Sequence, residues 1–306
     1  MGKIYQNFLE LIGNTPLLEV KNIEKNLGLE ARILVKLEYL NPAGSVKDRA
    51  ARFMIEDAEE RGLLKQGSVI IEPTSGNTGI ALSAICAYYK LKLIIVMPES
   101  MSIERRRLMS MYGTKIILTS SKDGMSGAIK KAKELNDQIN NSIILNQFEN
   151  EPNPQIHFLT TWPEIYNDLD GKIDFFVAGI GTGGSLSGIS KYLKSKNNII
   201  KSIGVEPLQS PFLTEGIIKP HKIQGIGANM RPKTLNLDYV DKILTIDENE
   251  ALDMVKTLSI EEALVMGISS CANLCACIKI AKENNDKIIV TLFPDSGERY
   301  LSIFEN

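Results

Sequence analysis

Short apolar, β-branched runs alternate along the chain with longer segments whose apolar residues recur at helical spacing. The short runs predict strands, and the longer segments predict helices. In the first half, the predicted strand and helix pairs are 32–37 and 46–60, 68–72 and 78–89, 92–97 and 102–112, and 115–119 and 125–135. The second half continues with strands at 174–178, 199–205 and 287–293, and helices at 186–194, 249–258 and 271–282. Alternation of this kind predicts parallel sheets with helices on both faces.

The alternation is interrupted between residues 146 and 167, where Pro152, Pro154 and Pro163 make the segment too proline-rich for a regular element. We therefore expect two α/β lobes with twisted, mostly parallel sheets. The larger domain comprises residues 1–40 plus 151–306, and a smaller, mobile domain comprises residues 41–150. In such proteins ligands bind beyond the carboxyl ends of strands and in the cleft between lobes, so the site is expected in loops that follow strands.

Composition narrows the class of protein. The chain has 306 residues, 43% of them hydrophobic, which suffices for a sizeable core. Lys and Arg total 35 against 37 Asp and Glu, and this balance argues against nucleic acid as a partner. The N-terminus has no apolar signal region, and no apolar run reaches the roughly 20 residues of a membrane span. We expect a cytoplasmic protein with no membrane association.

Cysteine and histidine usage points away from metal and imidazole chemistry. Cys271, Cys275 and Cys277 have a C-x3-C-x-C spacing among helix-forming neighbours, with no histidine nearby, so we interpret them as small core residues and expect no metal site. The two histidines, His157 and His221, lie far apart in the sequence. Some other group is therefore expected to move protons.

A lysine stands at the start of a predicted helix in the segment 41–49. Pro42 and Gly44 indicate a turn, and Ser45 is a candidate N-cap. Lys47 then falls in the first helical turn, where the helix dipole disfavours a cation and helps to lower its pKa. A lysine that deprotonates easily suits Schiff-base chemistry with a carbonyl compound. The alternative is a surface lysine in an ordinary Lys-Asp-Arg sequence.

Two loops after predicted strands offer anion sites. The loop 72–79 opens a helix with the hydroxyls of Thr74, Ser75 and Thr78 and the backbone of Gly76. Such a nest of donors can hold a carboxylate without any arginine, although the loop is also compatible with an ordinary N-cap. The loop 179–185 is a candidate phosphate cradle or, alternatively, a G-x-G-x-x-G-like dinucleotide site.

A third loop, 267–270, leads into the cysteine-bearing helix. Its hydroxyls either face a ring nitrogen or cap the helix.

Taken together, these loops resemble the cysteine synthase (O-acetylserine sulfhydrylase) and cystathionine β-synthase family. These are fold type II enzymes, similar to the tryptophan synthase β subunit, that use pyridoxal 5′-phosphate (PLP). The resemblance covers almost the whole chain, through the segments 12–17, 41–49, 74–79, 146–148, 181–185, 225–227, 267–270 and 294–300. It implies that the cofactor lies in the cleft between the lobes.

The resemblance also implies a role for particular residues. Lys47 matches the catalytic lysine that holds PLP as a Schiff base and serves as acid and base at the substrate α-carbon. Asn77 matches the partner of the cofactor's 3′ oxygen, and Ser269 matches the hydroxyl that faces the pyridine nitrogen. The phosphate site corresponds to Gly181, Thr182, Gly183, Gly184 and Ser185. The substrate carboxylate site corresponds to Thr74, Ser75, Gly76, Thr78 and Gln147.

The sequence departs from the family pattern beside the expected pocket. Where cysteine-forming members read Gly-Ile-Gly-Ala-Gly-Phe-Ile-Pro, residues 225–232 of this chain differ at three positions, which are Asn229, Met230 and Arg231. We assign Gly227, Ala228, Asn229 and Arg231 to substrate binding.

Two further departures occur outside this loop. Trp162 replaces a glycine and predicts either a displaced backbone or a new wall, and Cys271 replaces another glycine.

These departures indicate a changed leaving group or nucleophile, because a guanidinium pairs with a second amino acid's carboxylate. We expect β-elimination and β-replacement through an aminoacrylate, with L-cysteine as substrate, release of hydrogen sulfide and a second cysteine forming lanthionine. Alternatives are ordinary O-acetylserine sulfhydrylation to cysteine and acetate, cystathionine formation, or conversion of cysteine to serine and hydrogen sulfide. The resemblance further implies a homodimer and, as another alternative, docking of serine acetyltransferase.

Overall fold

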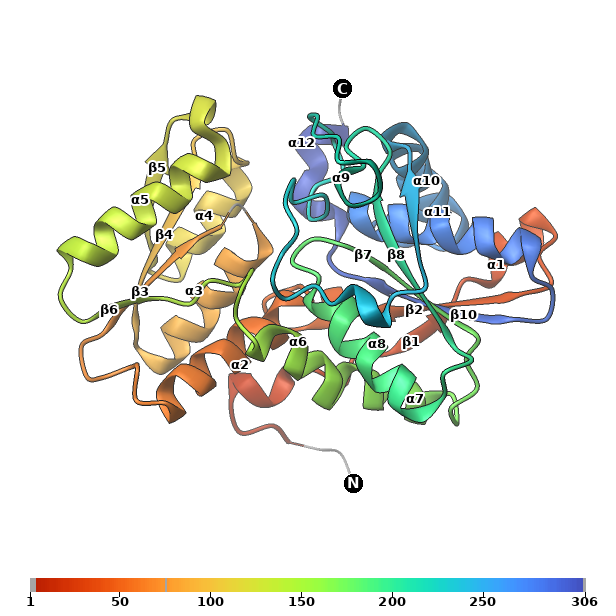
Figure 1. The fold of residues 1–306 in the computed structure, drawn as a ribbon, viewed down its shortest axis with the longest axis horizontal. Coiled ribbons are helices and arrows are strands. Elements are labelled where there is room, and N and C mark those ends of the chain that lie inside the picture. Colours follow the sequence, from red (N-terminus) through yellow and green to blue (C-terminus); the bar gives the residue numbers. More distant parts are fainter. Residues whose placement is uncertain (1–3, 75, 305–306) are drawn as a thin grey trace. The chain divides into compact units, whose positions relative to one another are not determined.

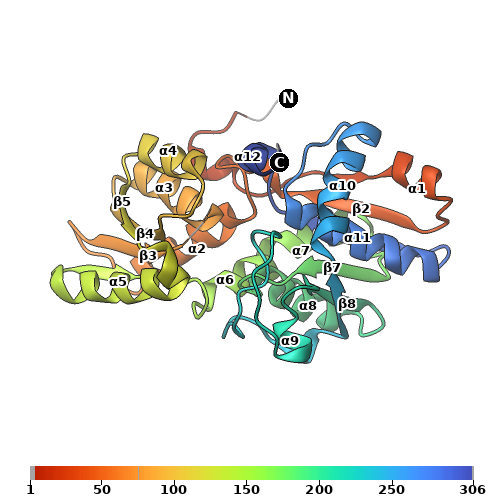
Figure 2. The ribbon, with the colours of Figure 1, turned by 90° about the horizontal axis from the view of Figure 1, so that it is seen from above.

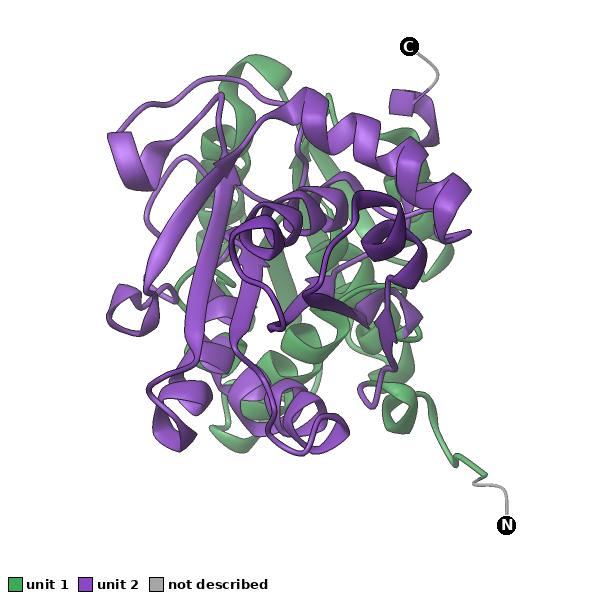
Figure 3. Cartoon of the chain, turned by 90° about the vertical axis from the view of Figure 1, so that its right-hand side faces the viewer, with its two compact units in different colours: residues 1–12, 41–153 green, residues 13–40, 154–306 purple. Residues whose placement is uncertain are grey.

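Strands and helices alternate to form two separate sheets, each within its own unit of the chain (Figure 3). The structure is a computed structural model that describes residues 4–74 and 76–304. Unit 1 is built from the segments 1–12 and 41–153, and unit 2 from the segments 13–40 and 154–306. No helix within the described residues is both long enough and apolar enough to cross a membrane.

Unit 1 contains a four-stranded parallel sheet in the order β5-β4-β3-β6. Its strands are β3 (Val69–Pro73), β4 (Lys92–Pro98), β5 (Lys115–Thr119) and β6 (Ser142–Ile144). Its helices are α2 (Lys47–Glu60), α3 (Asn77–Tyr89), α4 (Ile103–Met111) and α5 (Gly124–Gln138), with short 3-10 turns at Phe8–Leu11 and Ser121–Asp123. The predicted strand–helix alternation from 46 to 135 is confirmed, with shifts of one to three residues at some ends.

The alternation of side chains along β4 separates two layers of core. Leu93, Ile95 and Met97 belong to the cluster formed with α2, α3 and α4, whereas Ile94 and Val96 pack with α5. Figure 2 shows α5 on one side of β3 and β4, and α3 and α4 on the other. Because a buried parallel strand contributes side chains to both faces, β4 reads as a continuous apolar run.

The N-terminal segment belongs to unit 1, whereas the sequence-based division assigned residues 1–40 to the larger domain. Leu9 is buried in the same core cluster as Met54 and Ile55 of α2. The Arg52 guanidinium donates to the Leu9 carbonyl at 3.0 Å. A short 3-10 turn carries too few apolar residues for its packing partner to be read from the sequence, and this explains the difference.

Unit 2 contains a six-stranded sheet in the order β1-β2-β10-β7-β8-β9, in which only β1 runs antiparallel to its neighbour. Its strands are β1 (Leu17–Glu19), β2 (Arg32–Leu37), β7 (Phe175–Gly179), β8 (Lys201–Pro207), β9 (Lys242–Ile246) and β10 (Ile288–Phe293). Its helices are α1 (Lys21–Leu27), α7 (Trp162–Asp168), α8 (Gly184–Lys196), α9 (Phe212–Glu215), α10 (Glu248–Glu261), α11 (Ile268–Glu283) and α12 (Leu301–Phe304), with 3-10 turns at Glu38–Leu40, Leu237–Tyr239 and Gly297–Tyr300.

Helices cover both faces of this sheet, with α10 and α11 on one face and α7 and α8 on the other (Figure 1). In β7, Val177 packs with the α10 and α11 side, whereas Phe176 and Ala178 pack with the α7 and α8 side. The predicted α/β architecture with mostly parallel sheets is therefore confirmed. Strands β1, β6 and β9 are too short or too weakly patterned to have been predicted.

The proline-rich segment is helical, contrary to the prediction from sequence. It forms α6 (Pro152–Ile156), a π-helix (His157–Thr161) and α7. Pro152 and Pro154 lie in the first turn of α6, where backbone N–H groups have no helical acceptor in any case. Pro163 follows the π-helix, whose wider turn lets the Trp162 N–H donate to the His157 carbonyl. Prolines at helix starts are compatible with helix, and their number alone was misleading.

Candidate active site

A tight turn positions Lys47 as the first residue of α2 in unit 1. The Asp48 carboxylate, fully buried, accepts the Ala43 N–H at 2.6 Å and the Ser45 hydroxyl at 3.5 Å. The Ser45 hydroxyl oxygen in turn accepts the Lys47 N–H at 3.2 Å. The predicted first-turn position of the lysine is confirmed, and the hydroxyl of Ser45 accepts a first-turn N–H as expected of a capping residue, although Val46 directly precedes the assigned helix. These hydrogen bonds fix the direction in which α2, and with it Lys47, begins.

The loop between β3 and α3 brings together most of the predicted carboxylate-binding residues. Thr74 and Thr78 are buried, and the Gly76 N–H lies 3.5 Å from the Thr74 hydroxyl oxygen. The Thr78 hydroxyl donates to the Gln147 side-chain oxygen at 2.5 Å, which joins residues far apart in the sequence. The other two predicted residues here are Ser75, which lies outside the described residues, and Asn77, the first residue of α3.

Glu72 was not singled out from the sequence, and its carboxylate holds the backbone of residues 146 and 147 in place. Its buried carboxylate accepts the backbone N–H groups of Asn146 at 2.9 Å and of Gln147 at 3.1 Å. Burial raises the pKa of this carboxyl to about 7, against the lowering effect of the N–H donors. An acidic residue at the end of an otherwise apolar strand was the signal available in the sequence. Glu72 therefore positions Gln147 next to Thr78.

The predicted phosphate loop of unit 2 runs from the end of β7 into α8. Gly183 has φ 80° and serves as the N-cap, and the Gly184 N–H donates to the Thr182 hydroxyl at 3.3 Å. A Cβ atom on Gly181 would overlap the Gly225 carbonyl, and one on Gly183 would lie 2.6 Å from the Leu235 Cβ. The glycines are therefore required for close packing, and at Gly183 also for the left-handed backbone.

His157 supports this loop, although sequence reasoning gave the histidines no role. Its ring is buried, with Nε2 3.0 Å from the Ser185 hydroxyl and Nδ1 2.8 Å from the Thr161 hydroxyl. Ser185 lies in the first turn of α8, so the π-helix and the phosphate loop are joined through one imidazole. The spacing of four residues between His157 and Thr161 was a weak sequence signal, because nothing in it indicated Ser185 as the other partner.

Ser269 lies buried in the first turn of α11, close to the backbone that flanks the phosphate loop. A Cβ on Gly225 would come within 3.5 Å of the Ser269 hydroxyl, and the Gly227 N–H donates to the Ile180 carbonyl at 2.9 Å. Unit 2 thus brings the three predicted segments 181–185, 225–227 and 267–270 together.

The cysteines occupy the core, as predicted. All four are buried within the described structure. Burial raises the pKa of Cys86 and of Cys275 to about 12, and that of Cys271 well above its usual range. Thiols held in the protonated form in this way are poor nucleophiles and poor metal ligands. The altered residue Cys271 is therefore a small core side chain rather than a reactive group.

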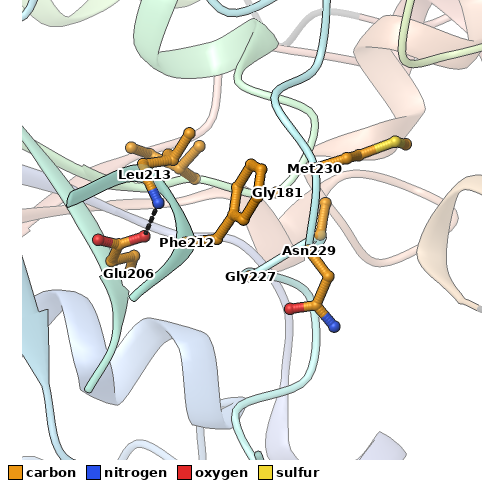
Figure 4. Close-up of a pocket in the computed structure, with 9 residues that line it drawn as sticks. Gly181, Glu206, Phe212, Leu213, Gly227, Asn229 and Met230 are labelled. Atoms are coloured by element: carbon orange, nitrogen blue, oxygen red, sulfur yellow. Dashed lines mark hydrogen bonds between the residues drawn. The ribbon is translucent and has the colours of Figure 1, made fainter. Parts of the chain in front are cut away.

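Residues 227–230 border a small pocket (Figure 4), and Arg231 follows them in the chain. Asn229 has φ 56°, and its side-chain oxygen accepts the Ser210 hydroxyl at 2.9 Å, so its side chain is used to attach one loop to another. Arg231 is exposed and forms no ion pair with any described residue. Besides residues 227–230, the pocket is lined by Ile180, Gly181, Glu206, Phe212 and Leu213.

Trp162 lies outside this pocket, and the prediction that it forms a pocket wall is wrong. It is fully buried in the core cluster of unit 2 that also contains Phe176. Its ring centroid lies 6.1 to 6.4 Å from those of Tyr166, Phe176 and Tyr192. A residue of this volume fills the core between the sheet and the helices α7 and α8. A sequence difference at one position does not reveal whether a new side chain points into the core or toward a ligand.

Known proteins are similar to this chain in sequence over nearly its full length. A family profile described as pyridoxal-phosphate dependent enzyme matches residues 8–295. The cysteine synthase of Staphylococcus aureus (strain Mu50 / ATCC 700699) is 46% identical over 302 residues, covering 98% of this chain and 96% of that protein. The chain belongs to the cysteine synthase family of pyridoxal-phosphate dependent enzymes.

Two solved structures of related proteins have the same fold. A hydrogen sulfide-producing enzyme from Fusobacterium nucleatum is 46% identical, covers 97% of this chain and 100% of its own, and superposes with a TM-score of 0.93. The cysteine synthase of Entamoeba histolytica is 41% identical, covers 98% of this chain and 90% of its own, and has a TM-score of 0.94. Cysteine-forming and sulfide-releasing proteins are thus both similar to this member of the family.

The residues present fit the PLP cofactor of the cysteine synthase family. A phosphate needs several hydrogen-bond donors, and the start of α8 supplies backbone N–H groups together with the hydroxyls of Thr182 and Ser185. Gly181 and Gly183 keep the loop free of side chains that would collide with neighbouring backbone. Lys47, the first residue of α2, offers a primary amine of the kind that reacts with an aldehyde.

Proposed function

We propose that this enzyme catalyses β-elimination and β-replacement on L-cysteine, releasing hydrogen sulfide and joining a second cysteine to form lanthionine. The observation that carries this choice is the exposed guanidinium of Arg231, which lacks an ion-pair partner among the described residues and follows the loop packed on Ile180 and Gly181. A guanidinium recognises a carboxylate in bidentate fashion, and sulfide has none. The similarity to a hydrogen sulfide-producing enzyme supports the same choice.

The reaction needs a base at the substrate α-carbon, and we assign that role to Lys47. Bound PLP withdraws electrons from this carbon and thereby makes its proton acidic. The Lys47 amine takes that proton and returns one at the end of the reaction, which general acid–base catalysis typically accelerates by about 10²–10⁴-fold. Thr74, Gly76, Thr78 and Gln147 bind the α-carboxylate and hold the α-carbon in place. Ser75 shares this role in the family pattern.

The other cofactor contacts follow the family pattern. We assign the 3′ oxygen to Asn77 and the phosphate to residues 181–185. Ser269 faces the ring nitrogen with a neutral hydroxyl, and a neutral partner limits charge build-up on the ring and favours loss of the β-substituent over transamination. Residues 227–229 and Arg231 bind the second amino acid. Residues 41–150 move as a mobile lobe, the enzyme is a homodimer, and serine acetyltransferase remains a proposed partner.

The second candidate is ordinary cysteine synthesis from O-acetyl-L-serine and sulfide. It is favoured by the 46% identity to a protein named cysteine synthase. Both reactions use the same lysine, carboxylate loop and phosphate loop, so they differ only in the leaving group and in the nucleophile. Arg231 has no role in the second reaction, because sulfide carries no carboxylate.

Products formed from L-cysteine alone test the choice. The holoenzyme is expected to release sulfide and to accumulate lanthionine, measured by a sulfide assay and by mass spectrometry. Arg231→Ala is expected to lower the rate of lanthionine formation about tenfold or more, because the second cysteine binds more weakly without the guanidinium. The same variant is expected to form cysteine from O-acetyl-L-serine at an unchanged rate. Arg231→Lys serves as a control that keeps the positive charge but cannot form the bidentate hydrogen bonds of a guanidinium. Absence of both sulfide and any thioether amino acid would reject the proposal.

A further inference from the structure

A buried arginine lies behind the loop that we assign to the substrate carboxylate. Arg105 on α4 is only 5% exposed, whereas Arg107, two residues further along the same helix, is exposed. Burial of a guanidinium is unfavourable unless the charge serves a structural or binding purpose. The hydroxyl and N–H groups of the 72–79 loop can hold a carboxylate without an arginine, so the position of Arg105 requires an explanation.

The guanidinium packs directly against the backbone of Gly76. A Cβ atom on Gly76 would lie 3.1 Å from Nη1 and 3.4 Å from Cζ of Arg105. Gly76 has φ −160°, so its backbone conformation does not require glycine. The absence of a side chain instead leaves room for the guanidinium beneath the loop. Gly76 lies between Thr74 and Thr78, which are both buried and both belong to the described part of the same loop.

We propose that Arg105 is a positioning residue that supports the 74–78 loop and places a positive charge behind the substrate α-carboxylate. The inference rests on the assignment of this loop to the carboxylate. Hydroxyl and N–H groups supply directional hydrogen bonds, and a full charge close behind them strengthens anion binding because the buried surroundings screen it weakly. The effect applies to any α-amino acid substrate and is therefore independent of the leaving group.

The test compares each amino acid with its methyl ester, which lacks the negative charge. L-cysteine and O-acetyl-L-serine are each assayed as acid and as ester, with the wild type, Arg105→Gln and Arg105→Lys. Arg107→Gln is the matched control, because it removes the same charge from an exposed position of the same helix. Values of KM and kcat are supplemented by calorimetric binding of each acid, and folding is checked by thermal unfolding.

Arg105→Gln is expected to raise KM for both acids by about 10- to 100-fold with a much smaller change in kcat, and to leave KM for both esters within a few-fold of the wild type. Arg105→Lys is expected to restore most of the preference for acid over ester, and Arg107→Gln is expected to match the wild type. Equal weakening of acid and ester in Arg105→Gln would overturn the proposal, since it would indicate a purely structural role.

A second variant covers the case in which Arg105→Gln does not fold. Gly76→Ala keeps the charge but places a methyl group against the guanidinium, so the acid is expected to lose about three times more affinity than the ester. An unchanged ratio of acid to ester in that variant would overturn the proposal. Because O-acetyl-L-serine is tested beside L-cysteine, the outcome is separate from the choice between cysteine consumption and cysteine synthesis.

Discussion

The two loops that we assign to anion binding have the same local structure and differ in the side chains that lie behind them. Both follow a parallel strand and open a helix, β3 into α3 in unit 1 and β7 into α8 in unit 2. Behind the phosphate loop lie glycine backbone and the imidazole of His157. Behind the carboxylate loop lie two ionisable side chains, Glu72 and Arg105.

The difference is instructive because the two ligands have different tasks. A resident cofactor phosphate is held permanently, and tightly packed neutral donors suit that purpose. A substrate carboxylate must bind and leave in every turnover, and charged groups behind the loop allow its affinity to be adjusted. We therefore expect substitutions in the loop 181–185 to affect cofactor retention, and substitutions in the loop 74–78 to affect substrate affinity.

The largest expected effect comes from Lys47→Ala. Turnover is expected to fall by at least about 10²–10⁴-fold, because no other group replaces the base at the α-carbon. The cofactor is expected to remain bound through the phosphate loop of unit 2 but to lose the absorbance of its lysine adduct. Absorbance spectra before and after dialysis, with single-turnover assays, measure both properties. Retained turnover together with an unchanged spectrum would contradict the role that we assign to Lys47.

A large effect on cofactor retention is expected from Gly183→Ala. The new methyl group meets Leu235 at 2.6 Å in a left-handed backbone of φ 80°, so we expect a loss of roughly 2–4 kcal/mol in the free energy of unfolding and poor PLP retention. Gly216→Ala is the matched control in the same unit, since it has φ 72° and no atom within 4 Å of the added Cβ. The control is expected to lose only about 1 kcal/mol and to keep its cofactor. Chemical unfolding and cofactor content after dialysis measure these effects, and equal losses in the two variants would contradict the packing argument.

The smallest expected effect on activity is that of Glu72, whose contribution is a pH dependence of stability. Its pKa is raised from 4.5 to about 7 in the folded protein, so the folded state binds the proton more tightly than the unfolded state. The resulting stabilisation is complete below pH 4.5 and is lost as the pH rises through about 7, with a slope of up to about 1.4 kcal/mol per pH unit. Denaturant unfolding at several pH values is expected to show this slope in the wild type.

Two variants isolate the contribution of that carboxyl group. Glu72→Gln is expected to lose the slope and to stay close to the wild type in stability at low pH, because the neutral amide resembles the protonated carboxyl group in having one carbonyl oxygen. Glu60→Gln, at an exposed position of α2, is the control and is expected to keep the wild-type slope. A slope that survives in Glu72→Gln would assign the pH dependence to another group.

The strands, helices and loops of this site could be predicted from the sequence better than the buried side chains that hold those loops in place. Alternating apolar runs predicted most strands and helices, and loops rich in glycine and hydroxyl residues predicted where β3 and β7 lead into helices. Glu72, Arg105 and His157 escaped notice because their importance depends on which distant segment each side chain meets. Trp162 was misjudged for the same reason, since the direction of one side chain is set by tertiary packing.

The change in free sulfide concentration in a single reaction mixture is the most direct test of whether the enzyme consumes or forms L-cysteine. The holoenzyme is supplied with L-cysteine, O-acetyl-L-serine and a low concentration of sulfide together, and the sulfide concentration is followed with time. The account predicts that sulfide rises while lanthionine accumulates, because L-cysteine is the preferred substrate and a second cysteine is the preferred nucleophile. A fall in sulfide with net formation of L-cysteine would contradict it and identify the enzyme as an ordinary cysteine-forming member of the family.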